Sequence, residues 1–194
     1  MKRKFSCIPD CSDCCINREY YPSEQFGKIG VLLLPQEVEE IEAQAQKLGV
    51  PVTILPRIAV GSDSSPERRI IAYQLMGKND DGDLCPFLDT ESGKRSPHGG
   101  FACKIYQDRP NACRAYPLID SEGARLDEHC RFCREHGTST ANEKTLKAES
   151  EALEKISGQV RAPDETYRVW RYATATGDKS LKDRMLPRGW VIDC

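Results

Sequence analysis

In the first third of the chain a short apolar run is followed by apolar residues at helical spacing. Residues 28–34 read Lys-Ile-Gly-Val-Leu-Leu-Leu and predict a short buried strand. Pro35 follows, and proline suits the first turn of a helix. Apolar residues then recur at near-helical spacing as far as Gly49, which is a typical residue to end a helix. We therefore expect an amphipathic helix from Pro35 to Gly49, and a second strand over 70–76.

Turn-forming residues separate these elements. Residues 52–68 carry prolines and a Gly-Ser-Asp-Ser-Ser run, and they predict a loop. Residues 79–82 (Asn-Asp-Asp-Gly) predict a turn, and residues 89–100 predict a surface loop. The first 22 residues show no persistent hydrophobic period and are expected to form an irregular loop.

The pattern changes after residue 138. Thr140 and Glu143 fit a capping box, and apolar residues up to Val160 mark one face of a helix. A second helix is expected from Pro163 to Gly177. We therefore divide the chain into a domain of residues 1–138 and a helical C-terminal extension of residues 139–194. The fold class expected is α+β, small and irregular.

Composition and charge narrow the function. The chain has 194 residues, of which 39% are hydrophobic and 30% charged, and its net charge is −2. Basic residues are mixed with acidic ones, so we expect no nucleic-acid partner. No apolar run approaches the roughly 20 residues of a membrane span, and the N-terminus lacks the apolar segment of a signal peptide. We expect a cytoplasmic protein without direct membrane insertion.

Cysteine is the residue type that changes this picture. The chain has ten cysteines. A secreted protein would pair them as disulfides, whereas a protein of the reducing cytoplasm uses them for metal or redox chemistry. We favour metal. The expected ligands are the nine cysteines before the last residue, namely Cys7, Cys11, Cys14, Cys15, Cys85, Cys103, Cys113, Cys130 and Cys133.

The spacing of these cysteines suits thiolate-bound metal. Cys11-x-x-Cys14 and Cys130-x-x-Cys133 each have the spacing at which two thiolates bind one metal. Thiolate selects zinc, copper(I) or iron–sulfur clusters. Consecutive side chains usually point apart, so Cys14 and Cys15 are expected to serve different centres, or one of them is not a ligand. Nine cysteines suffice for two four-thiolate centres with one to spare; a single centre with several structural cysteines is the alternative.

The choice of metal rests on the number of cysteines. Three histidines, His98, His129 and His136, are available, but nine cysteines leave no need for them, and we expect them at the surface. Arg109 and Arg114 either offset the charge of thiolate-bound metal or pair with Asp108 and nearby carboxylates. We expect one or two [4Fe-4S] clusters, with zinc as the alternative cofactor.

A catalytic role has less support in the sequence. Cys7-x3-Cys11-x2-Cys14 has the spacing of the radical S-adenosylmethionine motif, but no repeated βα units follow it. No cysteine is singled out as a nucleophile with its own base. We therefore lean towards a protein that is not an enzyme.

Several multi-residue blocks recur in the order typical of one family. They are Cys7-x3-Cys11-x2-Cys14-Cys15, Cys85-Pro-Phe-Leu, and Cys103-x-Ile-Tyr-x-x-Arg109-Pro-x-x-Cys113-Arg114-x-Tyr-Pro117. Over about residues 5–135 the chain resembles the YkgJ-type cysteine-cluster family, described as a zinc- or iron-chelating domain. The resemblance implies that the first seven cysteines chelate the metal; Cys130 and Cys133 are added from their spacing. The cysteine cluster is also similar to that of flagellin lysine N-methylases.

These observations lead to one functional expectation and two alternatives. We expect an iron–sulfur accessory protein that responds to redox state or oxygen, or carries electrons, and that binds a larger protein partner through residues 139–194. The alternatives are an S-adenosylmethionine-dependent methylase-like enzyme and a structural zinc module. No Gly-rich cofactor loop supports the methylase.

Overall fold

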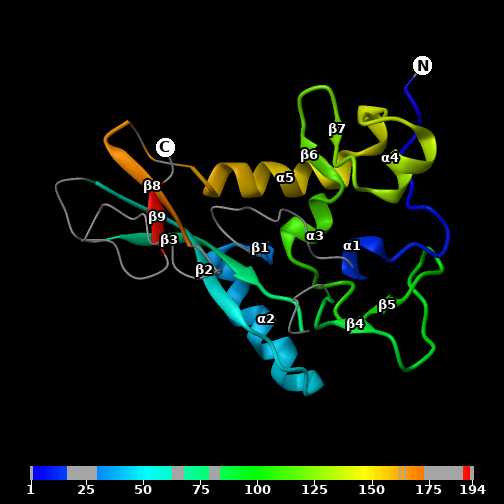
Figure 1. Cartoon of the computed structure of the whole chain (residues 1–194), viewed down its shortest axis with the longest axis horizontal. Coiled ribbons are helices and arrows are strands. Elements are labelled where there is room, and N and C mark those ends of the chain that lie inside the picture. Colours follow the sequence, from blue (N-terminus) through cyan, green and yellow to red (C-terminus); the bar gives the residue numbers. More distant parts are fainter. Residues whose placement is uncertain are drawn as a thin grey trace.

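The largest element of the fold is an antiparallel sheet of five strands (Figure 1). The computed structural model describes residues 2–16, 30–62, 68–78, 84–161, 163, 165–172 and 190–192. The sheet order is β1-β3-β2-β8-β9. Its strands are β1 (Val31–Leu33), β2 (Ile54–Ser62), β3 (Arg69–Leu75), β8 (Tyr167–Tyr172) and β9 (Trp190–Ile192). The mixed α+β fold class and the C-terminal helix expected from the sequence are confirmed, and the described residues form no barrel.

The first strand and helix follow the predicted pattern. β1 lies within the expected run, with Leu33 fully buried. The helix α2 (Pro35–Leu48) begins at the proline and ends at Gly49, whose φ of 63° is the left-handed conformation that glycine adopts readily. Ile41 and Ala45 are buried against β1 and β3. β3 confirms the expected strand over 70–76, whereas the expected turn over 79–82 lies outside the described residues.

The loop predicted for residues 52–68 is wrong, because β2 occupies 54–62 at the centre of the sheet. Proline is tolerated at Pro56 because β8 begins to pair with β2 only at Ile58, so this part of β2 is still an edge on that side. The register with β3 also shifts between Pro56 and Ile58. The five consecutive buried residues 57–61 outweigh the turn composition on either side.

The helix predicted from Pro163 to Gly177 is also wrong within the described residues. β8 is a strand there, paired on one side with β2 and on the other with β9. Its sequence, Tyr-Arg-Val-Trp-Arg-Tyr, consists mainly of aromatic and β-branched residues that suit a sheet. Trp170 is buried beside Ala59 and Trp190. The sheet therefore contains strands from both sides of residue 138, and the division into a domain of residues 1–138 and an extension of residues 139–194 stays a prediction.

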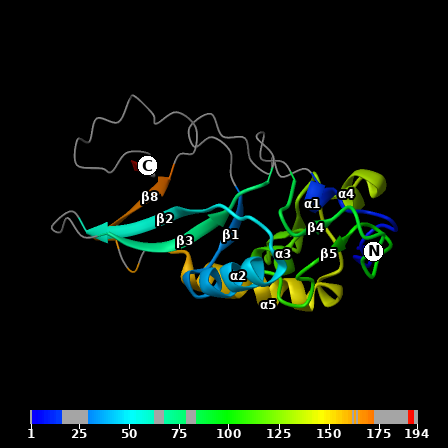
Figure 2. The same ribbon diagram turned by 90° about the horizontal axis from the view of Figure 1, so that it is seen from below.

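The expected helix after residue 138 is present, but it begins later. Asn142, not Thr140, caps a short 3-10 turn (Glu143–Thr145) by accepting a hydrogen bond from the Lys144 N–H. The helix α5 (Lys147–Gln159) follows directly. Figure 2 shows α2 and α5 on the same side of the sheet, and Val160 packs beside β2 and β3.

The cysteine-rich part of the chain is built from short elements. They are α1 (Asp13–Ile16), the hairpin of β4 (Leu88–Asp89) and β5 (Ala102–Cys103), α3 (Asn111–Ala115), the hairpin of β6 (Leu118–Asp120) and β7 (Arg125–Leu126), and α4 (Arg131–His136). Residues 90–100 form the expected exposed loop, with Gly100 buried at its end. No helix among the described residues has the length and hydropathy needed to cross a membrane.

Candidate metal centre

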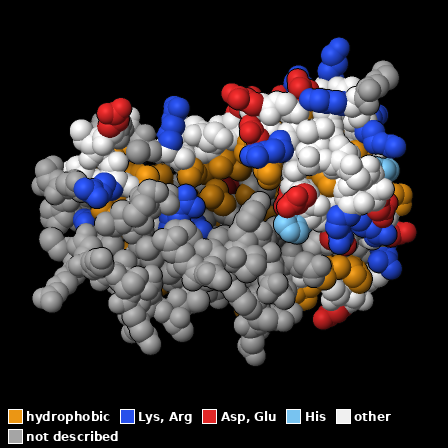
Figure 3. Space-filling view, turned by 45° about the horizontal axis from the view of Figure 1, so that its top comes forward, with side chains coloured by type: hydrophobic (Ala, Val, Ile, Leu, Met, Phe, Trp, Pro, Cys, Tyr) orange, Lys and Arg blue, Asp and Glu red, His pale blue; other side chains and the backbone are white. Residues whose placement is uncertain are grey.

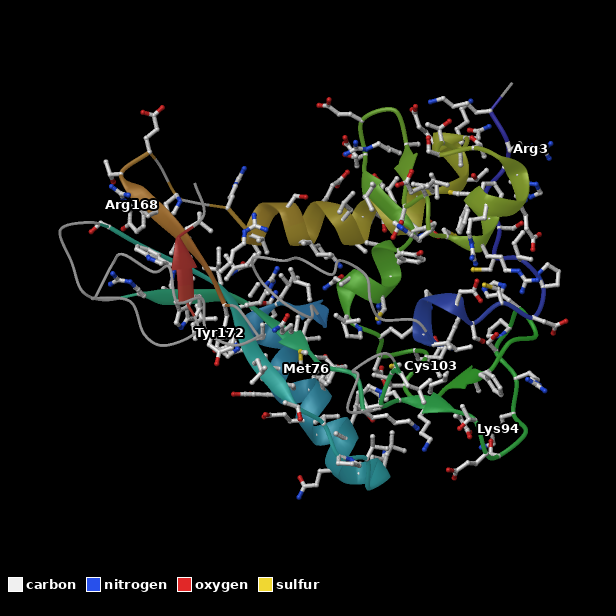
Figure 4. The ribbon with its side chains drawn as sticks, in the orientation of Figure 1. Arg3, Met76, Lys94, Cys103, Arg168 and Tyr172 are labelled. Atoms are coloured by element: carbon white, nitrogen blue, oxygen red, sulfur yellow. The ribbon has the colours of Figure 1, made fainter. Side chains whose placement is uncertain are left out.

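Five cysteines from separate parts of the chain line one cavity. The cavity has a volume of about 580 Å³. We call its cysteines the cavity set: Cys14, Cys15, Cys85, Cys103 and Cys113. Figure 4 shows Cys103 beneath α1 and α3; it is the last residue of β5. The cavity thus lies between the short elements that carry the cysteines and the five-stranded sheet.

Backbone hydrogen bonds position the cavity set. The Cys85 N–H donates to the Cys15 carbonyl at 2.8 Å, which fixes these two residues next to each other. The Leu88 N–H then donates back to the Cys85 carbonyl at 3.1 Å, and Leu88 pairs with Cys103 across the β4–β5 hairpin. The Cys85-Pro-Phe-Leu block is therefore a turn that brings Cys103 towards Cys85. The side chain of Phe87, within this turn, is buried, with 1% of its surface exposed.

Cys113 enters the cavity from α3, and Glu37 fixes the start of that helix. The Glu37 Oε1 atom accepts hydrogen bonds from the Asn111 N–H at 2.7 Å and from Asn111 Nδ2 at 2.8 Å. Its other oxygen accepts from the Leu34 N–H at 2.7 Å, at the start of α2. One carboxylate therefore caps two helices and joins the sheet to the cavity set.

The neighbouring thiols of Cys14 and Cys15 face each other. Their Sγ atoms are 3.8 Å apart, and both residues line the cavity. The expectation that these side chains point apart is therefore wrong, because the single turn of α1 places both residues on the cavity side. Both thiols are available to one centre.

The other four cysteines that the structure describes lie near one another and near the N-terminal segment, and we call them the outer set: Cys7, Cys11, Cys130 and Cys133. Cys130 and Cys133 pack in a separate hydrophobic cluster with Phe5, Ile8 and Phe132. The rings of Phe5 and Phe132 meet edge to face at 5.2 Å, which holds the N-terminal segment against α4. Cys7 is exposed, whereas Cys133 is 4% exposed.

The N-terminal segment is also held by polar contacts on both sides of Cys11. The Cys11 N–H donates to the Ile8 carbonyl at 3.1 Å, and Asp10 N–H donates to the His98 carbonyl at 2.8 Å. Asp13 forms an ion pair with Arg134 of α4. These contacts place Cys11 between the rest of the outer set and α1, where the cavity set begins.

Burial raises the pKa of thiols in both sets. Burial, with a smaller contribution from neighbouring cysteines, raises the pKa of Cys103 to about 12 and that of Cys133 to about 11. The hydrogen bond with Cys15, followed by burial, raises the pKa of Cys14 well above 9.0. Partial burial is also the first cause of the raised pKa of Cys11 and Cys130. In the folded chain without metal these thiols are therefore protonated at neutral pH, and metal must displace their protons.

Charged side chains line the cavity together with the cysteines. Arg109 lies beside the cavity, where its Nε donates to the Tyr106 carbonyl at 2.8 Å and its guanidinium lies 3.8 Å from the Tyr106 ring centroid. Arg114 instead donates to the Arg109 and Gln107 carbonyls. Of the two arginines considered in the sequence, Arg109 is therefore the one placed to offset the charge of the cavity set.

Sequence analysis missed three charged residues of this cavity. Arg57 and Arg171 line it from β2 and β8, and Asp127 lines it from the residue after β7. The arginines were missed because both strands were assigned to other structures. The aromatic and β-branched residues of 167–172, which favour a strand, are the signal that could have revealed the element that carries Arg171.

The histidines lie where the sequence predicted. His98, His129 and His136 are all exposed. His129 contacts the Asp127 carboxylate through its ring at 3.0 Å, and the His136 ring packs against Phe132. The nine cysteines are therefore left as the predicted ligands.

The donor chemistry of both sets fits zinc or iron held by sulfur. None of the nine cysteines, all of which the structure describes, is joined in a disulfide. Within the described ranges, no three histidine, cysteine or carboxylate side chains are arranged as they stand to hold a single ion. The cavity set and the outer set would each supply four thiolates, and one thiol of the cavity set would be left over. Their role as ligands stays a prediction.

Comparison with known proteins gives one match. Residues 6–134 match the model of the CxxCxxCC family, described as a putative zinc- or iron-chelating domain. No curated protein and no solved structure matches the chain. The matched region contains all nine cysteines of the two sets and ends within α4. The resemblance read from the cysteine blocks is thereby confirmed, and the chain belongs to the CxxCxxCC family of cysteine-rich zinc- or iron-chelating domains.

Proposed function

We propose that the protein holds iron–sulfur clusters and acts as an accessory protein that carries electrons or responds to redox state or oxygen. The observation that carries this proposal is the cavity set, because five cysteines line a cavity of about 580 Å³. A closed zinc site has four ligands about 2.3 Å from the metal and leaves no such space between them. A polynuclear cluster needs both the ligands and the volume.

The two sets support a two-centre arrangement. Cys11 of the outer set and Cys14 of the cavity set are three residues apart, so two centres would share the N-terminal segment. Cys7 is exposed, whereas Cys85 of the cavity set is 5% exposed. An electron donor or acceptor could approach the outer set, while the cavity set stays shielded by Phe87 and Ile105.

Partner binding through residues 139–194 belongs to the same proposal. The inner face of α5 is already occupied, since Ala152 is buried and Leu153 packs against the outer-set cluster. The outward face carries exposed charged side chains, among them Lys147, Glu151 and Lys155. A contact made by this face would be polar, as transient interfaces are at their rims.

The test is the visible spectrum and metal content of anaerobically purified protein, before and after exposure to air. We expect a brown protein with iron and inorganic sulfide in equal amounts, and bleaching in air if it is a sensor. Two four-iron clusters would double the iron expected for one. A colourless protein containing zinc would refute the iron–sulfur proposal.

A second candidate, a closed zinc site, is favoured by one distance. Four thiolates about 2.3 Å from one zinc stand about 3.8 Å apart at the corners of a tetrahedron. The Cys14 and Cys15 Sγ atoms are 3.8 Å apart. The same metal analysis decides between the two candidates, because a zinc module contains zinc without iron or sulfide.

A further inference from the structure

The cavity is larger than a metal cluster requires. A four-iron cluster has eight core atoms, and at about 30 Å³ each, the share of a water molecule, these fill about 240 Å³. The cavity of about 580 Å³ would keep more than half of its volume, and pockets for small molecules commonly measure about 300–1,000 Å³. There is space for an organic ligand beside the cysteines.

The sheet side of this cavity carries two arginines on neighbouring strands. Arg171 of β8 pairs in register with Ile58 of β2, and Arg57 precedes Ile58. Arg57 is 5% exposed, and its Nη1 donates to the Tyr172 carbonyl at 3.0 Å, which fixes the guanidinium beside β8. A guanidinium has five N–H donors in a planar fork, so it can keep such a contact and still bind a carboxylate.

The remaining lining determines what kind of anion fits. Val31 and Leu75 come from the sheet, and Phe87 and Ile105 come from the cysteine side. All four are buried apolar residues. Asp127 also lines the cavity, but its Oδ1 accepts hydrogen bonds from the His129 N–H at 2.9 Å and contacts the His129 ring at 3.0 Å. The lining therefore combines a large apolar surface with more positive than negative charge.

We propose that the cavity binds a small organic acid, with its carboxylate on Arg57 and Arg171 and its apolar body against Phe87, Ile105 and Leu75, next to the cysteines. Arg109 enters from the other side, beside the helix that carries Cys113, so the cysteines and the ligand have different cationic partners. This inference deepens the proposed function. It rests on that function only for the iron–sulfur cluster that the cysteines would hold. The positions of Arg57 and Arg171 themselves do not depend on metal.

The experiment measures binding of benzoate and hexanoate to the metal-loaded and metal-free protein by isothermal titration calorimetry. Benzamide, which has the same ring without a charge, is the neutral control probe. Both acids are expected to bind at millimolar concentration or below, and Arg171→Met is expected to weaken them by about 10- to 100-fold, the value of one charged hydrogen-bonded contact. Arg69→Met, on the exposed end of β3, is the matched control and should change binding by less than about twofold.

Arg57→Lys tests the other arginine of the proposed carboxylate site and keeps its positive charge. Far-UV circular dichroism checks that the Arg57→Lys and Arg171→Met proteins fold. The proposal is overturned if neither acid binds in either form, if benzamide binds as well as benzoate, or if folded Arg171→Met and Arg57→Lys proteins bind like the unmodified one. Iron content is measured on the same samples. A protein without iron that binds benzoate through Arg171 refutes the clusters alone, and an iron protein that binds neither acid refutes the pocket alone.

Discussion

The sheet half and the cysteine half of the molecule are held together by different means. The sheet half, made of the five strands and α2, has strands of up to nine residues, and Ile58, Val60 and Ile71 pack together in a cluster formed by its own strands. In the cysteine half, residues 2–16 and 84–138, the strands have two or three residues and the helices four to six. Figure 3 shows hydrophobic side chains gathered along the middle of one face, with charged groups beside them.

The difference shows where metal matters for stability. Elements of two to six residues bury little surface of their own, and isolated short helices and hairpins are marginal in water. Cysteine-bound metal can supply roughly 10 kcal/mol or more to a small domain. The hydrophobic pattern is therefore expected to stabilise one half, and the cysteines the other.

Removal of the metal is the strongest way to separate the halves. In chelator-treated protein, amide hydrogens of α4 and of the β6–β7 hairpin are expected to exchange orders of magnitude faster than in the loaded protein. Those of the β2–β3 pair should change little, because their hydrogen bonds lie in the hydrophobic sheet. Hydrogen exchange read by mass spectrometry measures both at once. Equal acceleration in both halves would contradict the comparison.

Paired cysteine substitutions should remove the two predicted centres one at a time. Cys85→Ser with Cys103→Ser is expected to abolish metal at the cavity set and leave the outer set loaded, and Cys130→Ser with Cys133→Ser should do the reverse. The reason is that the two pairs lie in separate hydrophobic clusters. Metal content per chain is the measurement, with Cys194→Ser as the matched control. Loss of all metal from either pair would mean a single shared centre.

A methyl group at Gly100 should disturb the cysteine half directly. A Cβ there would come within 2.3 Å of the Cys11 carbonyl oxygen and 2.4 Å of Ser12 Oγ, and Ser12 Oγ accepts from the Phe101 N–H at 2.7 Å. We expect Gly100→Ala to cost about 3 kcal/mol of unfolding free energy and to lower metal content.

Gly49→Ala is the matched change in the sheet half. Its Cβ would meet nothing within 4 Å, so only the positive φ is strained. A cost of about 1 kcal/mol with unchanged metal content is expected. Denaturant unfolding and metal analysis check both variants, and equal effects on metal would mean that Gly100 does not position the cysteines.

Only some of the helices and strands could be predicted from the sequence. β1, α2, β3 and α5 were predictable because each has a local hydrophobic period or a local stop such as Gly49. β2 and β8 were not, because the composition around Pro56 and Pro163 suggests a loop and a helix start. Both strands are stabilised by pairing with distant residues, and only the aromatic and β-branched residues of 167–172 favour a strand locally.

The candidate site shows a similar limit. The cysteines stand out in the sequence, and their order in blocks identifies the family. Their division into two sets depends on contacts such as the Cys85 N–H to the Cys15 carbonyl, which joins residues 70 positions apart in the chain. Arg57 and Arg171 carry no motif and are placed in the cavity only by the register of two strands.

Glu37 joins the two halves, so its substitution should have a smaller effect that reaches both. Glu37→Ala removes the acceptor of the Leu34 N–H and of both Asn111 donors. A loss of about 1–3 kcal/mol is expected because these donors are partly buried. Weaker metal retention should accompany it, since α3 carries Cys113. Glu39→Ala, at an exposed position of α2, is the control. Thermal unfolding and chelator competition measure the two effects, and a normal metal affinity in Glu37→Ala would show that α3 is held by other contacts.

The smallest expected effect is a loss of stability of the cysteine half at alkaline pH in the metal-free protein. In the folded chain burial raises the pKa of Cys103 to about 12 and of Cys133 to about 11, from 9.0. Between pH 9 and these values the folded chain binds more protons than the unfolded chain, so its stability is retained below pH 9 and falls as pH rises towards 11–12. The loss of stability is modest because the Cys103 side chain is only partly buried, and water reduces the cost of its charge.

Hydrogen exchange of α4 relative to β3 in metal-free protein, at pH 8 and pH 10.5, measures this weakening after correction for the intrinsic rate of each amide. Loading with metal should abolish it, because bound thiolates have already lost their protons. If α4 and β3 keep the same ratio at both pH values, the thiols of the metal-free protein titrate as in an unfolded chain. The cysteine half would then be open without metal, and the two halves would differ even more than the folded arrangement suggests.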